Sequence, residues 1–241
     1  LCRSSAASDV YKRQKYAIGV NSGTDAIKLS LNAFGIGVGD EVITAANTFV
    51  ATVGAINELG AKPVFVDCDD TFCMNVDLVE KAITKKTKAI VPVHFTGYMT
   101  NMKQINKIAK KNNLVVIEDA CQSILASQDG KIAGTWGATG CFSLHPLKNL
   151  NVWSDGGVII THDSKLNSKL RLLRNHGLKN RDEIQIMGFN SRLDTIQAVV
   201  GNWLIPQTKK IASQRIKNAN YYDRNFSKIH QIRIPPRPKG M

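Results

Sequence analysis

The sequence predicts an α/β protein in which a mostly parallel β-sheet lies between helices. From Tyr16 onward, short β-branched and apolar runs alternate with amphipathic segments of helical length, the pattern that repeated strand–helix units leave in a sequence. The predicted strands are continuously apolar, as expected for parallel strands covered by helices on both faces. The composition, with 43% hydrophobic and 21% charged residues, is ordinary for a globular domain.

The predicted elements follow one another in a regular order. Four segments rich in β-branched and apolar residues are expected to form strands, at 41–44, 63–66, 89–93 and 114–117. Helices are expected before and between them, at 24–34, 49–59, 76–83 and 102–112. The first helix is followed by Gly35, a residue suited to the left-handed conformation that often ends a helix.

A different pattern begins after the fourth predicted strand. A glycine-rich strand is expected at 156–161 and a helix at 163–174, followed by a loop near 179–190. A long helical stretch then extends from Leu193 to about residue 222. It contains Pro206, and because proline lacks the amide N–H that a helix needs, we expect a kink or break there.

The chain is expected to divide into three parts. Residues 1–14 (LCRSSAASDVYKRQ) differ in character from the rest and are interpreted as a non-native segment derived from a sequencing adaptor. Residues 15–205 are predicted to form a large domain that is truncated at its N-terminal side. Residues 206–241 are predicted to be a linker and the start of a smaller C-terminal domain that is largely missing, because the sequence stops in a proline-rich, extended segment.

Composition and charge exclude several classes of function. The net charge is +13, but the lysines are spread over helix-like stretches without interleaved aromatic residues, so no nucleic-acid partner is expected. No run of about 18 apolar residues is present to span a membrane. The five cysteines show neither CxxC pairs nor zinc spacing, so we expect reduced thiols in the cytoplasm and no metal site.

Three local features carry chemistry. Asp119 directly follows an apolar strand, where ligands of α/β proteins bind, although this residue alone would as readily cap the next helix. Lys148 lies between apolar residues, where desolvation can make it a nucleophile, although an isolated lysine is more often a surface charge. Residues 21–25 (NSGTD) begin the first helix, where backbone N–H groups form an anion site.

Together these features meet the requirements of pyridoxal 5′-phosphate (PLP). This cofactor needs an amine for its aldehyde, a carboxylate for its pyridine nitrogen and an anion site for its phosphate. An aromatic face over the ring is an advantage, and Phe49 is the candidate, although it could equally be a core residue. The sequence therefore predicts a PLP site that combines Lys148, Asp119 and the start of the first helix.

Several spaced blocks resemble the DegT/DnrJ/EryC1/StrS family, whose members are PLP-dependent aminotransferases of nucleotide-linked sugars. They occur in register from about Ala17 to Gly201 and are 22–26 (SGTDA), 39–43 (GDEVI), 48–52 (TFVAT), 93–94 (VH), 117–120 (IEDA), 142–143 (FS), 146–150 (PLKNL) and 188–194 (GFNSRLD). The resemblance implies an aspartate-aminotransferase-like fold (PLP fold type I), with a mixed, mostly parallel sheet between helices in the large domain.

The resemblance also implies a reaction and roles for individual residues. Lys148 would bind the cofactor covalently and later shuttle a proton, Asp119 would pair with the pyridine nitrogen, and Gln122 would lie near the phenolic oxygen. The enzyme would transfer an amino group, usually from glutamate in this family, to a keto group of a nucleotide-linked sugar. A dehydratase of the same family is an alternative, but such enzymes carry histidine in place of the lysine, and Lys148 is present.

The remaining implied roles concern the phosphate and the ring. Gly23, Thr24 and Ser143 would hold the phosphate, and Phe49 would stack on the ring. Asn190 would reach the phosphate in the site of a neighbouring subunit, which implies a homodimer with shared active sites. A non-catalytic protein that keeps the PLP fold is a further alternative, against which the intact set of lysine, aspartate and serine argues.

Four other positions leave more than one interpretation open. His94 and His145 are compatible with packed or hydrogen-bonding histidines at least as well as with catalytic ones. His176 could help to bind substrate or could end the preceding helix. Ser154 stands where many family members have glycine, and a serine fits there if the backbone avoids positive φ.

Overall fold

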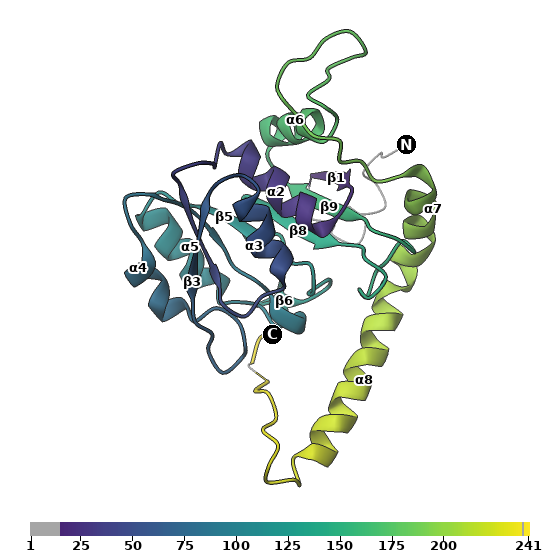
Figure 1. The fold of residues 1–241 in the computed structure, drawn as a ribbon. Helices are drawn as coiled ribbons and strands as arrows, with labels where there is room; N and C mark the ends of the chain where they lie inside the picture. Colours follow the sequence, from purple (N-terminus) through teal and green to yellow (C-terminus); the bar gives the residue numbers. More distant parts are fainter. Residues whose placement is uncertain (1–14, 238) are drawn as a thin grey trace.

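A seven-stranded sheet forms the centre of the molecule, and helices cover both of its faces (Figure 1). The computed structural model describes residues 15–237 and 239–241. The strand order is β1-β9-β8-β5-β4-β2-β3. Neighbouring strands are parallel except at β9, which is antiparallel to both β1 and β8. This arrangement confirms the predicted α/β class with a mixed, mostly parallel sheet.

The strands are short, and those in the middle of the sheet are buried. They are β1 (Tyr16–Val20), β2 (Glu41–Ala45), β3 (Lys62–Val66), β4 (Thr87–Val91), β5 (Val115–Asp119), β8 (Thr139–Ser143) and β9 (Gly157–Thr161). All five residues of β2 are buried, as expected for a strand with helices on both faces. A separate hairpin joins β6 (Ser127–Gln128) to β7 (Lys131–Ile132).

The helices form one layer on each side of the sheet. One layer consists of α2 (Gly23–Ala33), α3 (Val50–Asn57) and α6 (Ser164–Leu173). The other consists of the turn η1 (Val76–Leu78), α4 (Val79–Ala82) and α5 (Met102–Lys111), with a further turn η2 at Phe95–Gly97. Successive strand residues point to opposite layers: Ile117 packs in the α2/α3 core and Val116 in the α4/α5 core.

Most predicted elements are present, with boundaries shifted by a few residues, and two strands of the seven-stranded sheet were missed. The first four predicted strands correspond to β2 to β5, the strand predicted at 156–161 corresponds to β9, and Gly35 has the expected positive φ of 74°. The missed strands are β1 and β8. In β8 the sequence TGCFS contains small and polar residues, and Gly140 approaches the Gly134 backbone so closely that a Cβ would lie 2.3 Å from it. Such a strand shows no apolar run.

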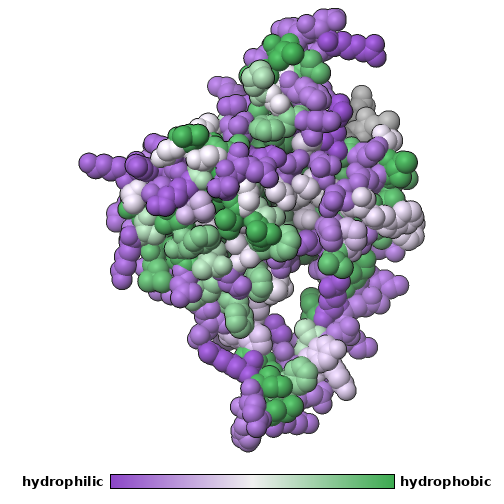
Figure 2. Space-filling view, in the orientation of Figure 1, coloured by the Kyte–Doolittle hydropathy of each residue, from purple (hydrophilic) through white to green (hydrophobic). Residues whose placement is uncertain are grey.

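The long C-terminal helical stretch is interrupted at Pro206, as predicted. α7 (Thr195–Leu204) leads into the turn η3 (Ile205–Gln207) and then α8 (Thr208–Phe226). α8 stands away from the sheet, and the chain then returns along an extended path toward it (Figure 1). Figure 2 shows hydrophobic side chains at the surface over α7 and near the far end of α8, where Phe226 is 38% exposed.

The predicted division into three parts stays a prediction. Residues 1–14 lie outside the described residues. The predicted boundary between 205 and 206 falls inside the turn η3, between α7 and α8. In the described part of the chain, no helix combines the length and the apolar character needed to cross a bilayer.

Candidate active site

The carboxyl ends of β5 and β8 lie side by side and bring two predicted site residues to one face of the sheet. Asp119 is opposite Cys141 in the parallel ladder, and Ser143 follows two residues later. Because strand side chains alternate between faces, Asp119 shares the face of Ile117, and Ser143 shares that of Cys141. Ile117 and Cys141 both pack in the α2/α3 core, so Asp119 and Ser143 face this layer.

The Asp119 carboxylate is held by donors from two elements. The residue is 6% exposed. Thr52 Oγ1, in the first turn of α3, donates to Oδ2 at 2.7 Å, and the N–H of Cys121 donates to Oδ1 at 3.1 Å. Thr52 Oγ1 in turn lies 2.7 Å from Thr48 Oγ1. The orientation of this carboxylate therefore depends on both α3 and the end of its own strand.

The start of α2 offers backbone donors to an anion. Ser22 caps the helix: its Oγ accepts from the N–H of Asp25 at 3.0 Å, and its carbonyl accepts from the N–H of Ala26 at 3.0 Å. The N–H groups of Gly23 and Thr24 lie earlier in the first turn, where a helix provides no internal acceptor. These N–H groups lie at the N-terminus of α2, which is the positive end of the helix dipole and favours an anionic ligand.

Gly23 lies where no side chain fits. A Cβ atom would be 2.7 Å from Cβ of Ser143 and 2.9 Å from Sγ of Cys121. This close approach brings the first turn of α2 against the end of β8, so the backbone and hydroxyl donors converge. Ser143 Oγ accepts from the N–H of His145 at 3.3 Å, which leaves the hydroxyl proton of Ser143 available to an anion.

Lys148 lies on a turn just beyond β8. Its N–H donates to the carbonyl of His145 at 2.8 Å, and the N–H of Leu147 donates to Nδ1 of His145 at 3.2 Å. His145 is therefore a turn-forming residue here. Lys148 is half-buried while Leu147 is 80% exposed, so the turn holds the lysine against the molecule.

The thiol of Cys121 lies within reach of the charges of both Lys148 and Asp119. Burial raises the pKa of Cys121 well above its ordinary value of 9.0, the Asp119 carboxylate adds to this rise, and the positive charge of Lys148 opposes it. The same thiol lies against Gly23. The structure thus brings the Asp119 carboxylate, the start of α2 and Ser143 together on one face at the carboxyl ends of β5 and β8, and Lys148 follows on the turn directly after β8.

Two other predicted residues lie beside this edge. Phe49 directly precedes α3 and is 65% exposed, which excludes the alternative that it is a core residue. It is the neighbour of Thr48, which contacts the Thr52 hydroxyl. Gln122 is half-buried in the turn that follows β5, three residues after Asp119. Their roles toward a cofactor stay predictions.

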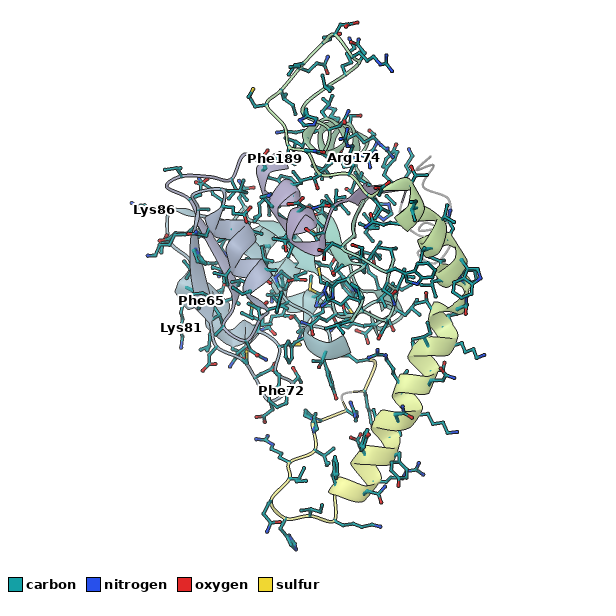
Figure 3. All side chains as sticks on the ribbon, turned by 45° about the vertical axis from the view of Figure 1, so that its right-hand side comes forward. Phe65, Phe72, Lys81, Lys86, Arg174 and Phe189 are labelled. Carbon is teal, nitrogen blue, oxygen red and sulfur yellow. The ribbon has the colours of Figure 1, made fainter. Side chains whose placement is uncertain are left out.

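The loop that carries Asn190 projects from the body next to α6 (Figure 1). Asn190 is exposed and forms a backbone bridge with Asn175 at the base of the loop. Figure 3 shows Arg174 and Phe189 at this base, where Arg174 Nη1 donates to the carbonyl of Gly19 at 2.5 Å. The predicted contact of Asn190 with a neighbouring subunit's phosphate stays a prediction.

Backbone conformation bears on two positions that the sequence left open. His176 and Gly177 have positive φ values of 57° and 75°, and the Gly177 N–H donates to the carbonyl of Leu172 at 2.8 Å, so this pair turns the chain just after α6 and its C-cap Arg174. Ser154, at the position where many family members have glycine, is not among the described residues with positive φ, whereas its neighbour Trp153 has a positive φ of 66°. The condition for serine at 154 is met.

His94 belongs to a buried structural network on the opposite face of the sheet. Its Nδ1 accepts from the N–H of Thr100 at 3.3 Å, so Nε2 carries the proton and donates to Glu118 at 2.9 Å. Glu118 also accepts from three backbone N–H groups of the 134–137 loop, and both side chains are fully buried. The interpretation of His94 as a packed histidine therefore holds, and Glu118 was not singled out from the sequence.

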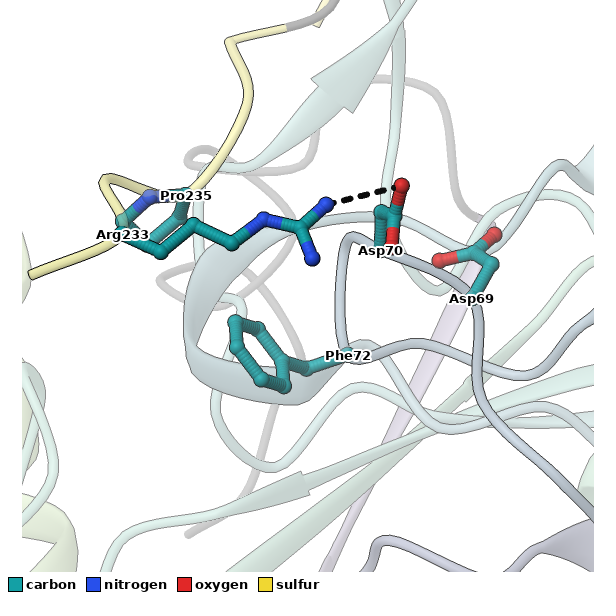
Figure 4. Close-up of a pocket in the computed structure, with 5 residues that line it drawn as sticks. All are labelled: Asp69, Asp70, Phe72, Arg233 and Pro235. Atoms are coloured by element: carbon teal, nitrogen blue, oxygen red, sulfur yellow. Dashed lines mark ion pairs between the residues drawn. The ribbon is translucent and has the colours of Figure 1, made fainter.

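A small pocket lies apart from this edge, where the C-terminal segment meets the loop after β3 (Figure 4). It is lined by Asp69, Asp70, Phe72, Arg233 and Pro235, with an ion pair of 2.9 Å between Arg233 and Asp70. It contains none of the predicted site residues. In residues 15–237 and 239–241, no group of three or more His, Cys, Asp and Glu side chains is placed to hold a metal ion.

The sheet order and the edge described above define the large α/β domain of an aspartate-aminotransferase-like protein. The chain belongs to the DegT/DnrJ/EryC1/StrS aminotransferase family, whose model matches residues 6–241.

Similar proteins include enzymes and a regulator. The chain is 48% identical to the "pleiotropic regulatory protein" of Geobacillus stearothermophilus, over 89% of this chain and 58% of that protein. It is 43% identical to UDP-N-acetyl-3-dehydro-alpha-D-glucosamine 3-aminotransferase of Acidithiobacillus ferrooxidans, over 93% and 61%. The crystal structure of S. venezuelae DesV matches with a TM-score of 0.94 and 35% identity, over 98% and 64%. The chain thus spans about three fifths of the length of these relatives.

Proposed function

We propose that the full-length protein is a PLP-dependent aminotransferase acting on nucleotide-linked keto sugars. The observation that carries the proposal is that Asp119 and the start of α2 meet at the carboxyl ends of β5 and β8, with Lys148 on the turn that directly follows β8. These groups fit PLP: they offer an amine, a nearly buried carboxylate and, beside Gly23, N–H and O–H donors for a phosphate. Solved relatives include a protein of Bacillus subtilis with bound PMP, the amine form of this cofactor.

The proposed roles follow from the chemistry of each group. Bound PLP supplies an aldehyde that condenses with amines and a ring that withdraws electrons. The Lys148 amine would hold the cofactor and, when free, would act as the base and acid that moves a proton at the α-carbon of the amino donor. Asp119 keeps the pyridine nitrogen protonated, because a carboxylate favours a cation beside it. Gln122, in the turn after β5, would contact the phenolic oxygen.

The phosphate and ring contacts complete the proposed site. The N–H groups of Gly23 and Thr24 and the hydroxyl of Ser143 bind the phosphate. Phe49 covers one face of the ring, and its exposure in the isolated chain leaves it available for this contact. Asn190 of a second subunit adds a further phosphate ligand, so the active protein is proposed to be a homodimer.

The substrate class is inferred from the relatives. Their names include transaminases of UDP- and dTDP-linked sugars, with 39% to 43% identity to this chain. We therefore infer a nucleotide-linked keto sugar as the amino acceptor and glutamate as the donor. The described cysteines are free thiols, which agrees with the proposed location in the cytoplasm.

A regulatory protein that binds PLP without turnover is the second candidate. It is favoured by the name of the relative from G. stearothermophilus, which describes a regulator. The intact set of Lys148, Asp119 and Ser143 favours the enzyme instead, because a carboxylate placed to keep the ring nitrogen protonated serves electron withdrawal, which cofactor binding alone does not require. The same lysine disfavours a dehydratase of this family.

The test uses the full-length protein and its Lys148→Ala variant. We expect the wild-type protein to bind PLP with a visible absorption band, and borohydride to fix the cofactor on Lys148, located by peptide mass spectrometry. Glutamate should convert the bound cofactor to PMP, and a 3-keto or 4-keto nucleotide sugar should convert it back. Lys148→Ala should reduce turnover by at least about 10³-fold, since it removes both the covalent link and the proton carrier.

The matched control is Lys110→Ala, an exposed lysine of α5, which should keep wild-type turnover. Transaminase turnover in Lys148→Ala would refute the assigned mechanism. PLP binding without any change on addition of glutamate would favour the regulatory candidate.

A further inference from the structure

Two threonine hydroxyls extend from the Asp119 carboxylate toward the segment that carries Phe49. Thr52 Oγ1 lies 2.7 Å from Asp119 Oδ2, and Thr48 Oγ1 lies 2.7 Å from Thr52 Oγ1. Thr52 is 1% exposed and Asp119 is 6% exposed. Both distances are typical of well-formed hydrogen bonds between hydroxyl and oxygen groups, and one bond ends on a carboxylate that is almost fully buried.

The direction of both hydrogen bonds follows from the chemistry of the groups. An ionised carboxylate can only accept, so the hydroxyl of Thr52 donates its single proton to Asp119. Thr52 Oγ1 can then only accept from Thr48, whose hydroxyl is the donor. The chain of donors therefore runs from Thr48 through Thr52 to Asp119.

The donors around Asp119 also fix its rotation. Oδ1 accepts from the N–H of Cys121 at 3.1 Å, and Oδ2 accepts from Thr52. The first donor belongs to the backbone at the end of β5, and the second to the first turn of α3. Rotation of the carboxylate about its Cβ–Cγ bond would break both hydrogen bonds, so the two elements together set its plane.

We propose that Thr52, supported by Thr48, is a positioning residue that holds the Asp119 carboxylate in the orientation needed to meet the pyridine nitrogen. Thr48 precedes Phe49 directly, so the same two hydroxyls link the carboxylate at one side of the ring to the segment bearing the proposed ring-stacking residue. This inference rests on the proposed function. It assigns to two threonines a role that depends on their hydroxyl groups rather than on their volume.

The test compares Thr52→Val and Thr52→Ser in the full-length protein. Valine has nearly the shape of threonine but no hydroxyl, whereas serine keeps the hydroxyl. We expect Thr52→Val to lower kcat and to raise the dissociation constant of PLP, each by roughly tenfold or more, since a hydrogen bond to a buried charge is lost. The KM for glutamate should change less than about twofold. Thr52→Ser should restore wild-type values to within about threefold.

The matched control is Thr44→Val. Thr44 is a fully buried threonine of β2 whose Oγ1 donates to the carbonyl of Val91 at 3.0 Å. Loss of its hydroxyl should lower the melting temperature without changing the dissociation constant of PLP. Equal losses in Thr44→Val and Thr52→Val, or a Thr52→Ser variant as weak as Thr52→Val, would overturn the proposal.

Crystal structures of the cofactor-free variants separate this inference from the proposed function. We expect the carboxylate of Asp119 to rotate in Thr52→Val and to keep its orientation in Thr52→Ser. If the wild-type protein neither binds PLP nor transfers an amino group, the proposed function fails, and these structures still decide the positioning role. An unchanged Asp119 in Thr52→Val would refute that role.

Discussion

At the scale of single residues, the contact of Gly23 with Ser143 and Cys121 makes a sharp prediction. Gly23→Ala should lower the free energy of unfolding by about 1–3 kcal/mol, because the new Cβ overlaps Cβ of Ser143 and Sγ of Cys121. Urea unfolding of the full-length protein measures this loss. The control is Gly54→Ala in α3, where a Cβ meets no atom within 4 Å, and alanine should stabilise the helix by about 0.5–1 kcal/mol. Equal effects would contradict the packing described here.

Because the thiol of Cys141 is buried, we predict that the protein loses stability in alkaline solution. Burial raises the pKa of its thiol from 9.0 to about 12. A raised pKa means that the folded protein retains a proton that the unfolded chain loses, so the stabilisation is complete below pH 9 and disappears as the pH rises toward 12. Between pH 8 and 10 the free energy of unfolding should fall by roughly 1 kcal/mol through this group.

The measurement compares wild-type protein with Cys141→Ala by urea unfolding at several pH values from 8 to 10. The variant should lose about 1 kcal/mol less over this range, whatever the constant cost of the cavity. Cys68→Ala, which changes a half-exposed thiol, serves as control and should follow the wild-type slope more closely. Parallel slopes for all three proteins would show that Cys141 does not titrate in this way.

Some site residues could be predicted from the sequence, and others could not. Lys148, Asp119 and residues 21–25 stand out because PLP needs one group of each kind and because each follows a recognisable local pattern. Thr52 carries no local signal: it lies 67 residues from Asp119, and the two meet because α3 packs beside the end of β5. Contacts of this kind depend on tertiary packing, which a single sequence does not display.

At the scale of elements, two helix caps make a paired prediction. Ser22→Ala and Asp163→Ala each remove a side chain that accepts from backbone N–H groups, at the starts of α2 and α6. Each should lower the free energy of unfolding by about 1 kcal/mol. Because α2 bears the proposed phosphate site, Ser22→Ala alone should also weaken PLP binding, measured by titration of the cofactor-free protein. Equal PLP affinity in both variants would argue against α2 as the phosphate site.

Elements were predictable where one physical signal dominates. β2, β4 and β5 show apolar runs because they are largely buried, whereas β3, at the end of the sheet, keeps an apolar run although it is only partly buried. Pro206 ends α7 through its missing N–H. β8 escaped because its small residues are required by close backbone contacts rather than by hydrophobic burial. The predicted helix at 76–83 is a single 3-10 turn followed by a short helix, since helix boundaries are only weakly encoded locally.

At the scale of the whole molecule, α7 presents an unusually apolar surface. Ile196, Val199 and Trp203 recur on one side of this helix and are 75%, 62% and 64% exposed. Exposed patches of this kind promote association in water. We predict that the 241-residue chain self-associates at micromolar concentration, and that Ile196→Lys combined with Val199→Lys reduces this association, as measured by light scattering.

The control adds the same charge elsewhere, through Ser213→Lys and Gln214→Lys on the exposed side of α8. If both double variants reduce association equally, net charge rather than the α7 surface is responsible.

The end of β5 carries two neighbouring carboxylates, Glu118 and Asp119, which point to opposite faces of the sheet. Glu118 accepts hydrogen bonds from the 134–137 loop on one face of the sheet, while Asp119 accepts from Thr52 of α3 on the other face. A slip of one residue in the pairing of β5 would exchange the faces of the two residues, so that Glu118 would face the proposed cofactor site and Asp119 the opposite core. The hydrogen-bonded ladder with β4 and β8 therefore determines which of two chemically similar acids faces the proposed site.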